Sequence, residues 1–447
     1  MRRQLRTFAR PPRLPQEGEP DTAARESRRE TYAFLKVFAG AGAFQLLDIA
    51  ARLLILKLLT TRLTRDGYGE YNLVTATAAL GTIIFGCEAY RYLQRHVVSV
   101  KHPSAWLSAQ LTFESILLLG VATSAALIPA RLVPSSLVWL AGANALLVGT
   151  IVWTELMIVE MVRYVVLQRR GVIGEGAKFA RSVAQIALLL ALPHPTIRDA
   201  MVVLAGSNVV AVAVLMQAAF GRQQWRSGLA HGRTHVLQML RYARHFFLPA
   251  LANQLLRVGD RFFVYGILSA ADLASYSIAY NIQLLCYGAA GGLASSLVYP
   301  LIIRDVRTDG PPPWWRWLRV QLVIQVAASA VLFLMARPII YLVSSSQYSD
   351  AIATTRSLSV LPPLMVLSGG LLMRFVAAGQ VRRFAVITVC SALVSVSLYA
   401  LLIPSRGVAG AVYATLCGYA FSALASSIVI RLTPPGGAAP LDDAVRV

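Results

Sequence analysis

The feature that most constrains this chain is a series of long apolar segments that recurs along most of its length. A helix needs about 20 consecutive, mostly apolar residues to cross a bilayer. Twelve segments approach or exceed that length, with shorter polar stretches between them. They are Phe34–Leu59, Tyr71–Tyr90, Ala105–Ile128, Leu137–Val159, Ala177–Leu192, Met201–Phe220, Phe246–Leu268, Ala274–Ile303, Leu318–Met335, Leu358–Ala378, Phe384–Ile403 and Val408–Ile430. The sequence therefore predicts an all-α polytopic membrane protein of about twelve transmembrane helices.

The composition excludes an ordinary soluble protein. Of the 447 residues, 56% are hydrophobic and 14% are charged, whereas soluble domains carry about 25% charged residues. The formal net charge is +21, and a strongly basic balance often marks a nucleic-acid-binding protein. Here the basic residues lie mainly in short loops between apolar segments. This distribution excludes nucleic acid as a partner and indicates contact with anionic membrane lipids.

The basic residues alternate from loop to loop. The first, third, fifth, seventh, ninth and eleventh loops hold few, and the loops between them are rich in Arg. Because the positive-inside rule places the richer loops in the cytoplasm, we expect both termini there and the protein in the cell membrane. The first thirty residues are polar and lack the apolar core of a signal peptide, so we interpret them as a cytoplasmic tail.

The chain also contains an internal repeat. The longest internal polar stretch, residues 221–245, divides six apolar segments from six, and the halves match at an offset of 209 residues. An even number of helices per half predicts two six-helix bundles related by a pseudo-twofold axis along the membrane normal. The predicted parts are a tail (1–30), a bundle (31–220), a basic cytoplasmic linker (221–245), a second bundle (246–432) and a cytoplasmic tail (433–447). The matched polar residues are Gln45 with Gln254, Arg52 with Arg261, and Tyr71-Asn72 with Tyr280-Asn281.

Several predicted helices carry charged residues. A charged side chain at the bilayer centre costs roughly 2.5–3.5 kcal/mol on insertion scales, so it needs a partner or a water-filled cavity. Because most of these charges are arginines, we predict a net cationic cavity between the bundles. One guanidinium group can bind two phosphate oxygens at once, so such a cavity suits a phosphate-bearing substrate. The candidate substrate-binding residues are Arg52, Arg261, Arg257, Arg91, Arg95 and Arg374. The acidic candidates, which hold these groups or carry a coupling cation, are Asp48, Asp260, Glu88 and Glu114.

Two features have alternative interpretations. The charges can instead neutralise one another in structural pairs, such as Asp48 with Arg52, while Arg91 and other residues near helix ends reach the headgroups. A row of polar and aromatic side chains at helical spacing in the eighth segment suits sugar rings, or else packs against a neighbouring helix. These sugar-contact candidates are Tyr276, Tyr280, Gln283 and Tyr287.

The sequence predicts neither an enzyme nor a cofactor or metal site. The four cysteines lie in apolar segments without a CxxC pair, and the six histidines form no HExxH motif. The glycine-bearing segment Arg169–Gly176 is neither a dinucleotide-binding nor a Walker motif. No polar stretch between the apolar segments is long enough for a catalytic domain.

Four segments have the order and spacing of known motifs: LTRDGYGEY at Leu63–Tyr71, Asp260-Arg261 with ASYSIAY at Ala274–Tyr280, SQYSDA at Ser346–Ala351, and LIPSRGVAGAVYAT at Leu402–Thr415. In these segments the chain resembles the polysaccharide transporter (Wzx-type) branch of the multidrug/oligosaccharidyl-lipid/polysaccharide (MOP) superfamily. The resemblance implies a flippase that moves a polyprenyl-diphosphate-linked oligosaccharide to the outer leaflet by alternating access. It also implies a polysaccharide polymerase and glycosyltransferases as partners.

Three other functions compete with this interpretation. A cation-coupled small-molecule exporter of the same superfamily would have an acid-dominated cavity. A peptidoglycan-precursor flippase usually has two further helices. A non-transporting scaffold of a polysaccharide assembly complex would need no charged residues on inward helix faces.

Overall fold

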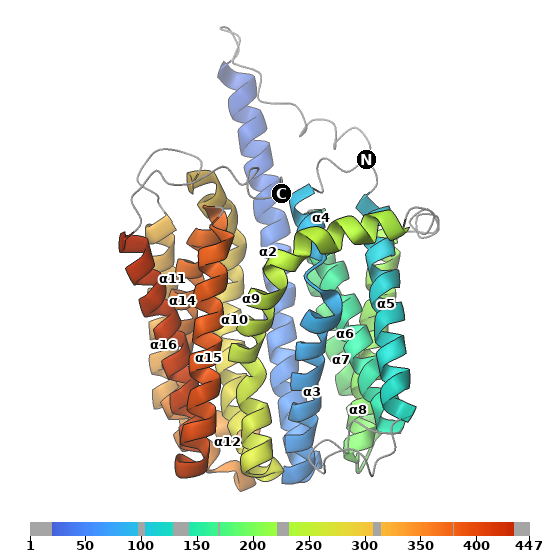
Figure 1. Cartoon of the computed structure of the whole chain (residues 1–447), viewed down its shortest axis with the longest axis vertical. Coiled ribbons are helices and arrows are strands. Elements are labelled where there is room, and N and C mark those ends of the chain that lie inside the picture. Colours follow the sequence, from blue (N-terminus) through green and yellow to red (C-terminus); the bar gives the residue numbers. More distant parts are fainter. Residues whose placement is uncertain are drawn as a thin grey trace.

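The computed structural model describes residues 20–96, 103–127, 143–168, 170–220, 232–306, 314–378 and 380–432, and these ranges contain helices and no strand. The long helices run roughly side by side (Figure 1). The predicted all-helical membrane fold is confirmed. Of the predicted flanking and linking regions, residues 1–19, 221–231 and 433–447 lie outside the described residues.

Twelve described helices are at least 17 residues long and correspond in order to the twelve predicted spans. Those of the N-terminal half are α2 (Pro20–Arg62), α3 (Arg65–Gly86), α5 (Pro103–Leu127), α6 (Ala143–Leu167), α7 (Gly171–Ala191) and α8 (Ile197–Phe220). Those of the C-terminal half are α9 (Gly232–Ile267), α10 (Ala270–Val306), α11 (Trp314–Leu334), α14 (Leu361–Ala377), α15 (Val381–Arg406) and α16 (Val408–Leu432).

Four short helices interrupt this pattern, namely α4 (Tyr90–His96), α12 (Ala336–Val343), the 3₁₀ turn η4 (Ser346–Tyr348) and α13 (Ala351–Leu358). The axes of α11 and α12 meet at 77°. Two long helices begin far before their apolar segments, α2 at Pro20 and α9 at Gly232. Proline suits the first turn of a helix, because its missing N–H would have no partner there. Hydropathy cannot mark such helical extensions, because they need no apolar run.

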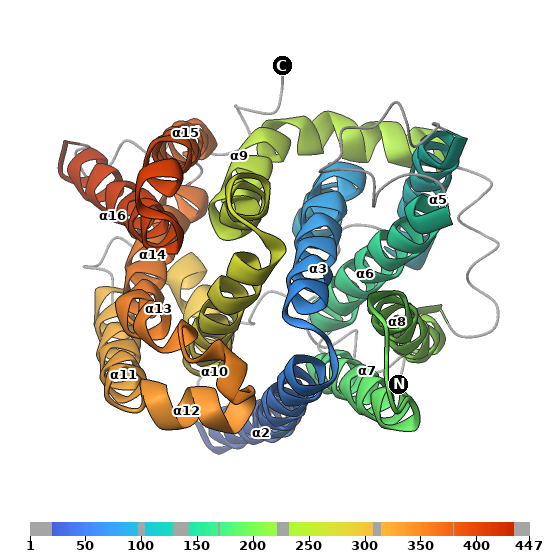
Figure 2. The same cartoon turned by 90° about the horizontal axis from the view of Figure 1, so that it is seen from below.

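The two halves lie on either side of the molecule. In the N-terminal half α2 packs on α7, and α6 and α7 pack on α8; in the C-terminal half α15 packs on α9 and α16, and α16 on α14. The main contacts between the halves join α3 to α9 and α10. Seen along the helices, the other N-terminal helices lie to one side of α2 and α3 and most of the C-terminal helices lie to the other (Figure 2). This arrangement agrees with the two predicted bundles.

The helices differ in how apolar they are. By length and composition alone, six segments of the described chain qualify as membrane spans, and the bent pair α11–α12 adds a seventh. Among the helices outside this set, α2 carries Asp48 and Arg52, α7 carries Arg181, and α9 carries Arg257 and Asp260. The charged residues are therefore concentrated in helices that a hydropathy criterion rejects, and these helices surround the cavity described next.

Candidate functional site

A cavity of about 480 Å³ lies between the two halves. Its wall includes Arg52, Leu56 and Leu59 of α2, and further residues of α3 and α7, namely Tyr68, Tyr71, Asn72, Thr75, Arg181, Ser182 and Gln185. On the opposite side the wall is formed by Arg257 of α9 and by five residues of α10, namely Asn281, Leu284, Leu285, Tyr287 and Gly288. Glu155 of α6 and Leu204 of α8 complete it. Both bundles therefore contribute to one cavity, whose wall contains charged as well as apolar side chains.

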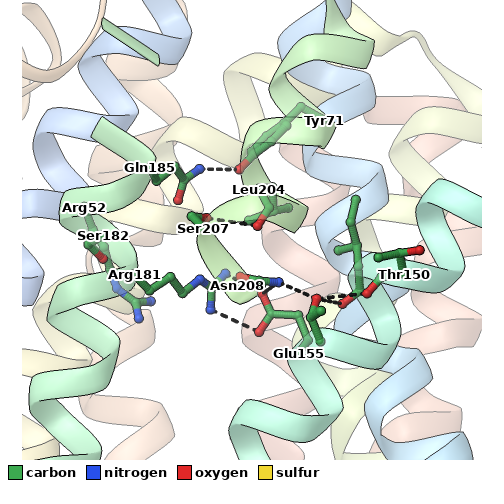
Figure 3. Close-up of polar contacts among 12 residues, drawn as sticks. Arg52, Tyr71, Thr150, Glu155, Arg181, Ser182, Gln185, Leu204, Ser207 and Asn208 are labelled. Atoms are coloured by element: carbon green, nitrogen blue, oxygen red, sulfur yellow. Dashed lines mark hydrogen bonds and ion pairs between the residues drawn. The ribbon is translucent and has the colours of Figure 1, made fainter. Parts of the chain in front are cut away.

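Three guanidinium groups, from Arg52, Arg181 and Arg257, line this cavity, whereas Glu155 is the single carboxylate in its wall among the described residues. Arg181 forms a two-bond ion pair with Glu155, with one contact of 3.1 Å between Nη1 and Oε2 (Figure 3). Asn208 donates to Thr154 Oγ1 at 2.9 Å and to Glu155 Oε1 at 3.4 Å, which fixes the carboxylate. The wall is thus net cationic.

Arg52 forms an ion pair with Asp48. Its Nε donates to Asp48 Oδ2 at 2.8 Å, and Ser182 Oγ donates to Asp48 Oδ1 at 2.6 Å. Asp48 is buried, while the Arg52 side chain remains 46% exposed. The carboxylate therefore orients the guanidinium and leaves its two terminal nitrogens free to bind an anion.

Arg257 differs from the other two, because no carboxylate of the described residues lies within ion-pair distance of it. Its side chain is exposed in the cavity, and its backbone carbonyl accepts a hydrogen bond from Tyr280 OH at 2.8 Å. At the repeat offset of 209 residues, Arg257 corresponds to Asp48. The position that supplies an acid in the first half thus supplies a base in the second.

The predicted pseudo-twofold is visible in one hydrogen bond. Asn281 Nδ2 donates to Asn72 Oδ1 at 3.1 Å, and these residues are 209 positions apart. Two repeat-related side chains can meet only where the symmetry axis passes between them. Both residues line the cavity, so the axis runs through its wall.

Arg261, predicted to face the cavity like Arg52, lies behind the wall. It is 5% exposed, its Nη2 donates to Asn281 Oδ1 at 3.1 Å, and its guanidinium lies 5.3 Å from the ring centre of Tyr280. The neighbouring Asp260 is fully buried, and it accepts hydrogen bonds from Tyr276 OH and from the Arg261 backbone N–H. These two residues form part of the interior of the C-terminal bundle.

The predicted sugar-contact row is divided in the same way. Tyr276 and Tyr280 have no exposed surface, and Gln283 is buried with its Nε2 donating to Thr355 O at 3.0 Å. Tyr287 alone of the four lines the cavity. The alternative interpretation, a packed helix interface, therefore describes the first three residues.

The remaining candidates lie outside the cavity wall. Arg91, Glu88 and Glu114 belong to a separate polar cluster within the N-terminal bundle. Arg374 is half-buried in the last turn of α14. The side chain of Arg95 lies outside the described residues. The structure thus brings Arg52, Asp48 and Arg257 to one site, together with Arg181 and Gln185, which the sequence interpretation missed.

The cavity is closed at the end of the molecule where α2 joins α3. Arg65 of α3 pairs with Asp350 and donates to Ser275 Oγ at 2.7 Å, and Lys57 Nζ donates to Ser344 O at 2.6 Å. Gly69 permits the approach, because a Cβ there would lie 1.9 Å from the carbonyl oxygen of Ala270. These contacts all join the N-terminal half to the C-terminal half.

The chain resembles known proteins in sequence over part of its length and in fold over most of it. The sequence family described as polysaccharide biosynthesis protein matches residues 177–353. No match was found among curated proteins. Among solved structures, the lipid II flippase MurJ in an inward closed conformation matches with a TM-score of 0.71 at 14% identity, over 90% of this chain and 88% of that one.

Two further solved structures share the fold. The Vibrio cholerae MATE transporter VcmN in its bent form matches with a TM-score of 0.60 at 16% identity, over 89% of this chain and 95% of that one. A MOP superfamily transporter from Pyrococcus furiosus matches with a TM-score of 0.62 at 15% identity, over 89% and 96%. The resemblance inferred from the sequence is confirmed, and the chain is a multi-pass membrane protein with the fold of the MOP superfamily transporters.

Proposed function

We propose that this protein is a flippase that moves a polyprenyl-diphosphate-linked oligosaccharide from the cytoplasmic to the outer leaflet during surface polysaccharide biosynthesis. The family match to polysaccharide biosynthesis proteins and the likeness to a lipid II flippase support the substrate class. The single observation that carries the proposal is the cavity between the halves, in whose wall three guanidinium groups outnumber one carboxylate.

The chemistry of the wall suits a diphosphate. The terminal nitrogens of Arg52 and Arg257 form no hydrogen bond to a carboxylate among the described residues. Guanidinium groups bind phosphate oxygens in a bidentate manner. Tyr71, Asn72, Gln185 and Tyr287 offer hydroxyl, amide and ring surfaces to sugars. The apolar face of α2 beside them exposes Leu46, Leu47 and Leu54, so the polyprenyl chain can remain in lipid. No covalent bond changes.

Alternating access supplies the movement. We place the termini in the cytoplasm from the distribution of basic loops, so the closed end at Arg65 and Asp350 is the outer end. Rocking of the two bundles about the axis near Asn72 and Asn281 would open that end and present the headgroup to the outer surface.

A small-molecule exporter of the same superfamily is the alternative, because MATE transporters share the fold. A cavity for cationic compounds needs an excess of carboxylates. The single wall carboxylate here, Glu155, is already neutralised by Arg181, which disfavours a cationic cargo.

The test is flipping in reconstituted vesicles. The full chain would be placed in liposomes that carry a fluorescent polyprenyl-diphosphate saccharide, and the amount of label accessible to an external quencher followed with time. We expect flipping by the natural sequence and much slower flipping by Arg52→Ala or Arg257→Ala. The proposal would be overturned if both variants flipped the lipid as fast as the natural sequence does. It would also be overturned if the protein moved a cationic dye in place of the lipid.

A further inference from the structure

A polar cluster lies inside the N-terminal bundle, away from the cavity. It contains three carboxyl groups, Glu88 at the end of α3, Glu114 of α5 and Glu160 of α6, each at most 5% exposed. None of them lines the cavity. The proposed binding of a headgroup therefore leaves this cluster without a role.

The charges in the cluster do not balance. Glu88 accepts from Arg91 Nε at 2.8 Å, and Glu160 accepts from Arg163 Nη1 at 2.7 Å. Glu114 has no exposed surface and no cationic partner among the described residues. Three carboxyl groups thus face two guanidinium groups, which leaves one negative charge unmatched. A buried carboxyl group without a cation is far more stable when it is neutral.

The hydrogen bonds of the cluster also show that a donor is missing. Gln110 Nε2 donates both to Glu114 Oε1 at 2.8 Å and to Glu160 Oε2 at 3.0 Å, so two carboxyl groups converge on one amide. Gln110 Oε1 and Glu114 Oε2 are buried and lack any hydrogen-bond partner in the described part of the chain. Both orphaned atoms are acceptors. A proton on Glu114 removes the unmatched charge and turns one of these acceptors into a hydroxyl group.

The cluster also lies against a break in the helix. Cys87 and Glu88, which separate α3 from α4, have φ values of 48° and 56°, a conformation that ordinary residues seldom adopt. A Cβ on Gly86 would lie 3.7 Å from Glu160 Oε1 and 3.9 Å from Glu114 Oε1. Any movement of this break therefore changes the surroundings of both carboxyl groups.

Other titratable groups of the cluster and of the helices packed against it come from three directions. From the α3–α4 break come Cys87, Glu88, Tyr90 and Arg91, and from α6 come Glu160 and Arg163. The Arg163 guanidinium also lies 3.7 Å from the ring centre of Tyr90. From α9, which packs on α5 and α4, His235 stacks on Trp106 and Tyr242 contacts Tyr92.

We propose that Glu114, with Glu160 beside it, is a proton-binding site of the N-terminal bundle. It holds one proton in the conformation described and releases it when the α3–α4 break moves. On release the O–H bond breaks, its electron pair stays on the carboxylate and the proton passes to water. Glu160 shares α6 with Glu155, which holds Arg181 in the cavity wall, so a shift of α6 reaches both sites. The link from proton release to transport rests on the proposed function.

The ligand is assigned as a proton and not as a metal ion. The described residues include no group of three or more His, Cys, Asp or Glu side chains that could hold a metal. Glu160 is also already paired with Arg163, which would repel a second cation.

The test is infrared spectroscopy of the full chain in lipid nanodiscs, followed through a pH titration. At neutral pH we expect the carbonyl band of one buried, protonated carboxyl group that Glu114→Gln removes. The control Glu175→Gln, which changes a half-exposed carboxylate paired with Lys178 at 2.8 Å, should keep the band. Gln110→Met removes the shared donor that favours the charged form, so it should move the titration to higher pH. It also keeps the test informative if Glu114→Gln fails to fold.

Two results would overturn the site: a band unchanged in Glu114→Gln, or a band that responds to sodium at constant pH. In the vesicle assay, Glu114→Gln should flatten the dependence of flipping on pH. If flipping itself is absent from the natural sequence, the infrared result still decides the proton site. If the band persists in Glu114→Gln while Arg257→Ala still slows flipping, the proton site fails and the proposed function stands.

Discussion

Arg257 stands out among single residues, because its guanidinium is the cavity cation without a carboxylate partner in the described structure. Hydrogen bonds to charged groups contribute about 1.5–3 kcal/mol each. An anionic headgroup bound in the cavity would be the first group to neutralise this side chain, so its removal should weaken binding more than the removal of a paired cation.

We therefore expect Arg257→Ala to slow flipping by roughly 10–100-fold, the rate equivalent of one such hydrogen bond or a little more. Arg257→Lys should recover part of the rate, because lysine keeps the charge and loses the two-nitrogen fork. The measurement is the rate of flipping in vesicles. Arg356→Ala, which removes an exposed arginine of α13, is the matched control and should leave the rate unchanged.

A second prediction concerns the pair formed by Arg181 and Glu155. Arg181→Ala should impair flipping strongly, because it leaves the Glu155 carboxylate unpaired in a cavity that must accept an anion. The double variant Arg181→Ala with Glu155→Gln should be faster than Arg181→Ala alone. A double variant as slow as the single one would mean that Arg181 contacts the substrate directly.

At the scale of whole elements, α3 and α10 meet through Gly69 and the backbone of Ala270. Gly69→Ala should destabilise the protein by about 1–3 kcal/mol, the usual effect of overpacking, because the main chain cannot move aside. Gly120→Ala is the matched control on α5, where nothing lies within 4 Å, and it should be neutral or stabilising by up to about 1 kcal/mol. Thermal unfolding in detergent measures both.

The elements also show which features could be predicted from the sequence. The twelve long helices could, because each apolar segment has only one way to satisfy its backbone hydrogen bonds in lipid. The short helices α4, α12 and α13 could not, because they lie at breaks and ends where no apolar run is needed.

The site was predictable only in part. The buried charges indicated a cavity and identified Arg52 and Arg257. They could not indicate that Arg261 turns inward to Asn281, because both faces of α9 carry polar residues. Arg181 was missed because it stands near the start of its apolar segment, where an arginine ordinarily reaches the headgroups.

At the scale of the whole molecule, the contacts at the closed end hold the two halves together. The exposed ion pair of Arg65 and Asp350 is one of them, and such pairs contribute only about 0.2–1 kcal/mol. Asp350→Asn should therefore raise the population that is open at this end by up to about fivefold. Leu285→Cys, which places a thiol in the cavity wall, would report the opening through labelling by an impermeant maleimide outside intact cells.

The control for this measurement is Asp66→Asn, which removes an exposed carboxylate near the same end that forms no ion pair in the described structure. Its labelling should equal that of the natural sequence. Equal labelling in Asp350→Asn would show that backbone contacts such as those of Lys57 keep the end closed without the ion pair.

The two halves meet at Asn72 and Asn281 yet differ at the equivalent positions Asp48 and Arg257. If the chain arose by duplication, the ancestral half would have assembled with its own copy, and every change would have struck both copies at once. Fusion removed that restriction. One copy could keep an acid, Asp48, that orients Arg52, while the other acquired the opposite charge at the same position, where Arg257 now lines the cavity. The two bundles then bind the headgroup with unequal strength. We expect the headgroup to move across the membrane with the bundle that binds it more strongly.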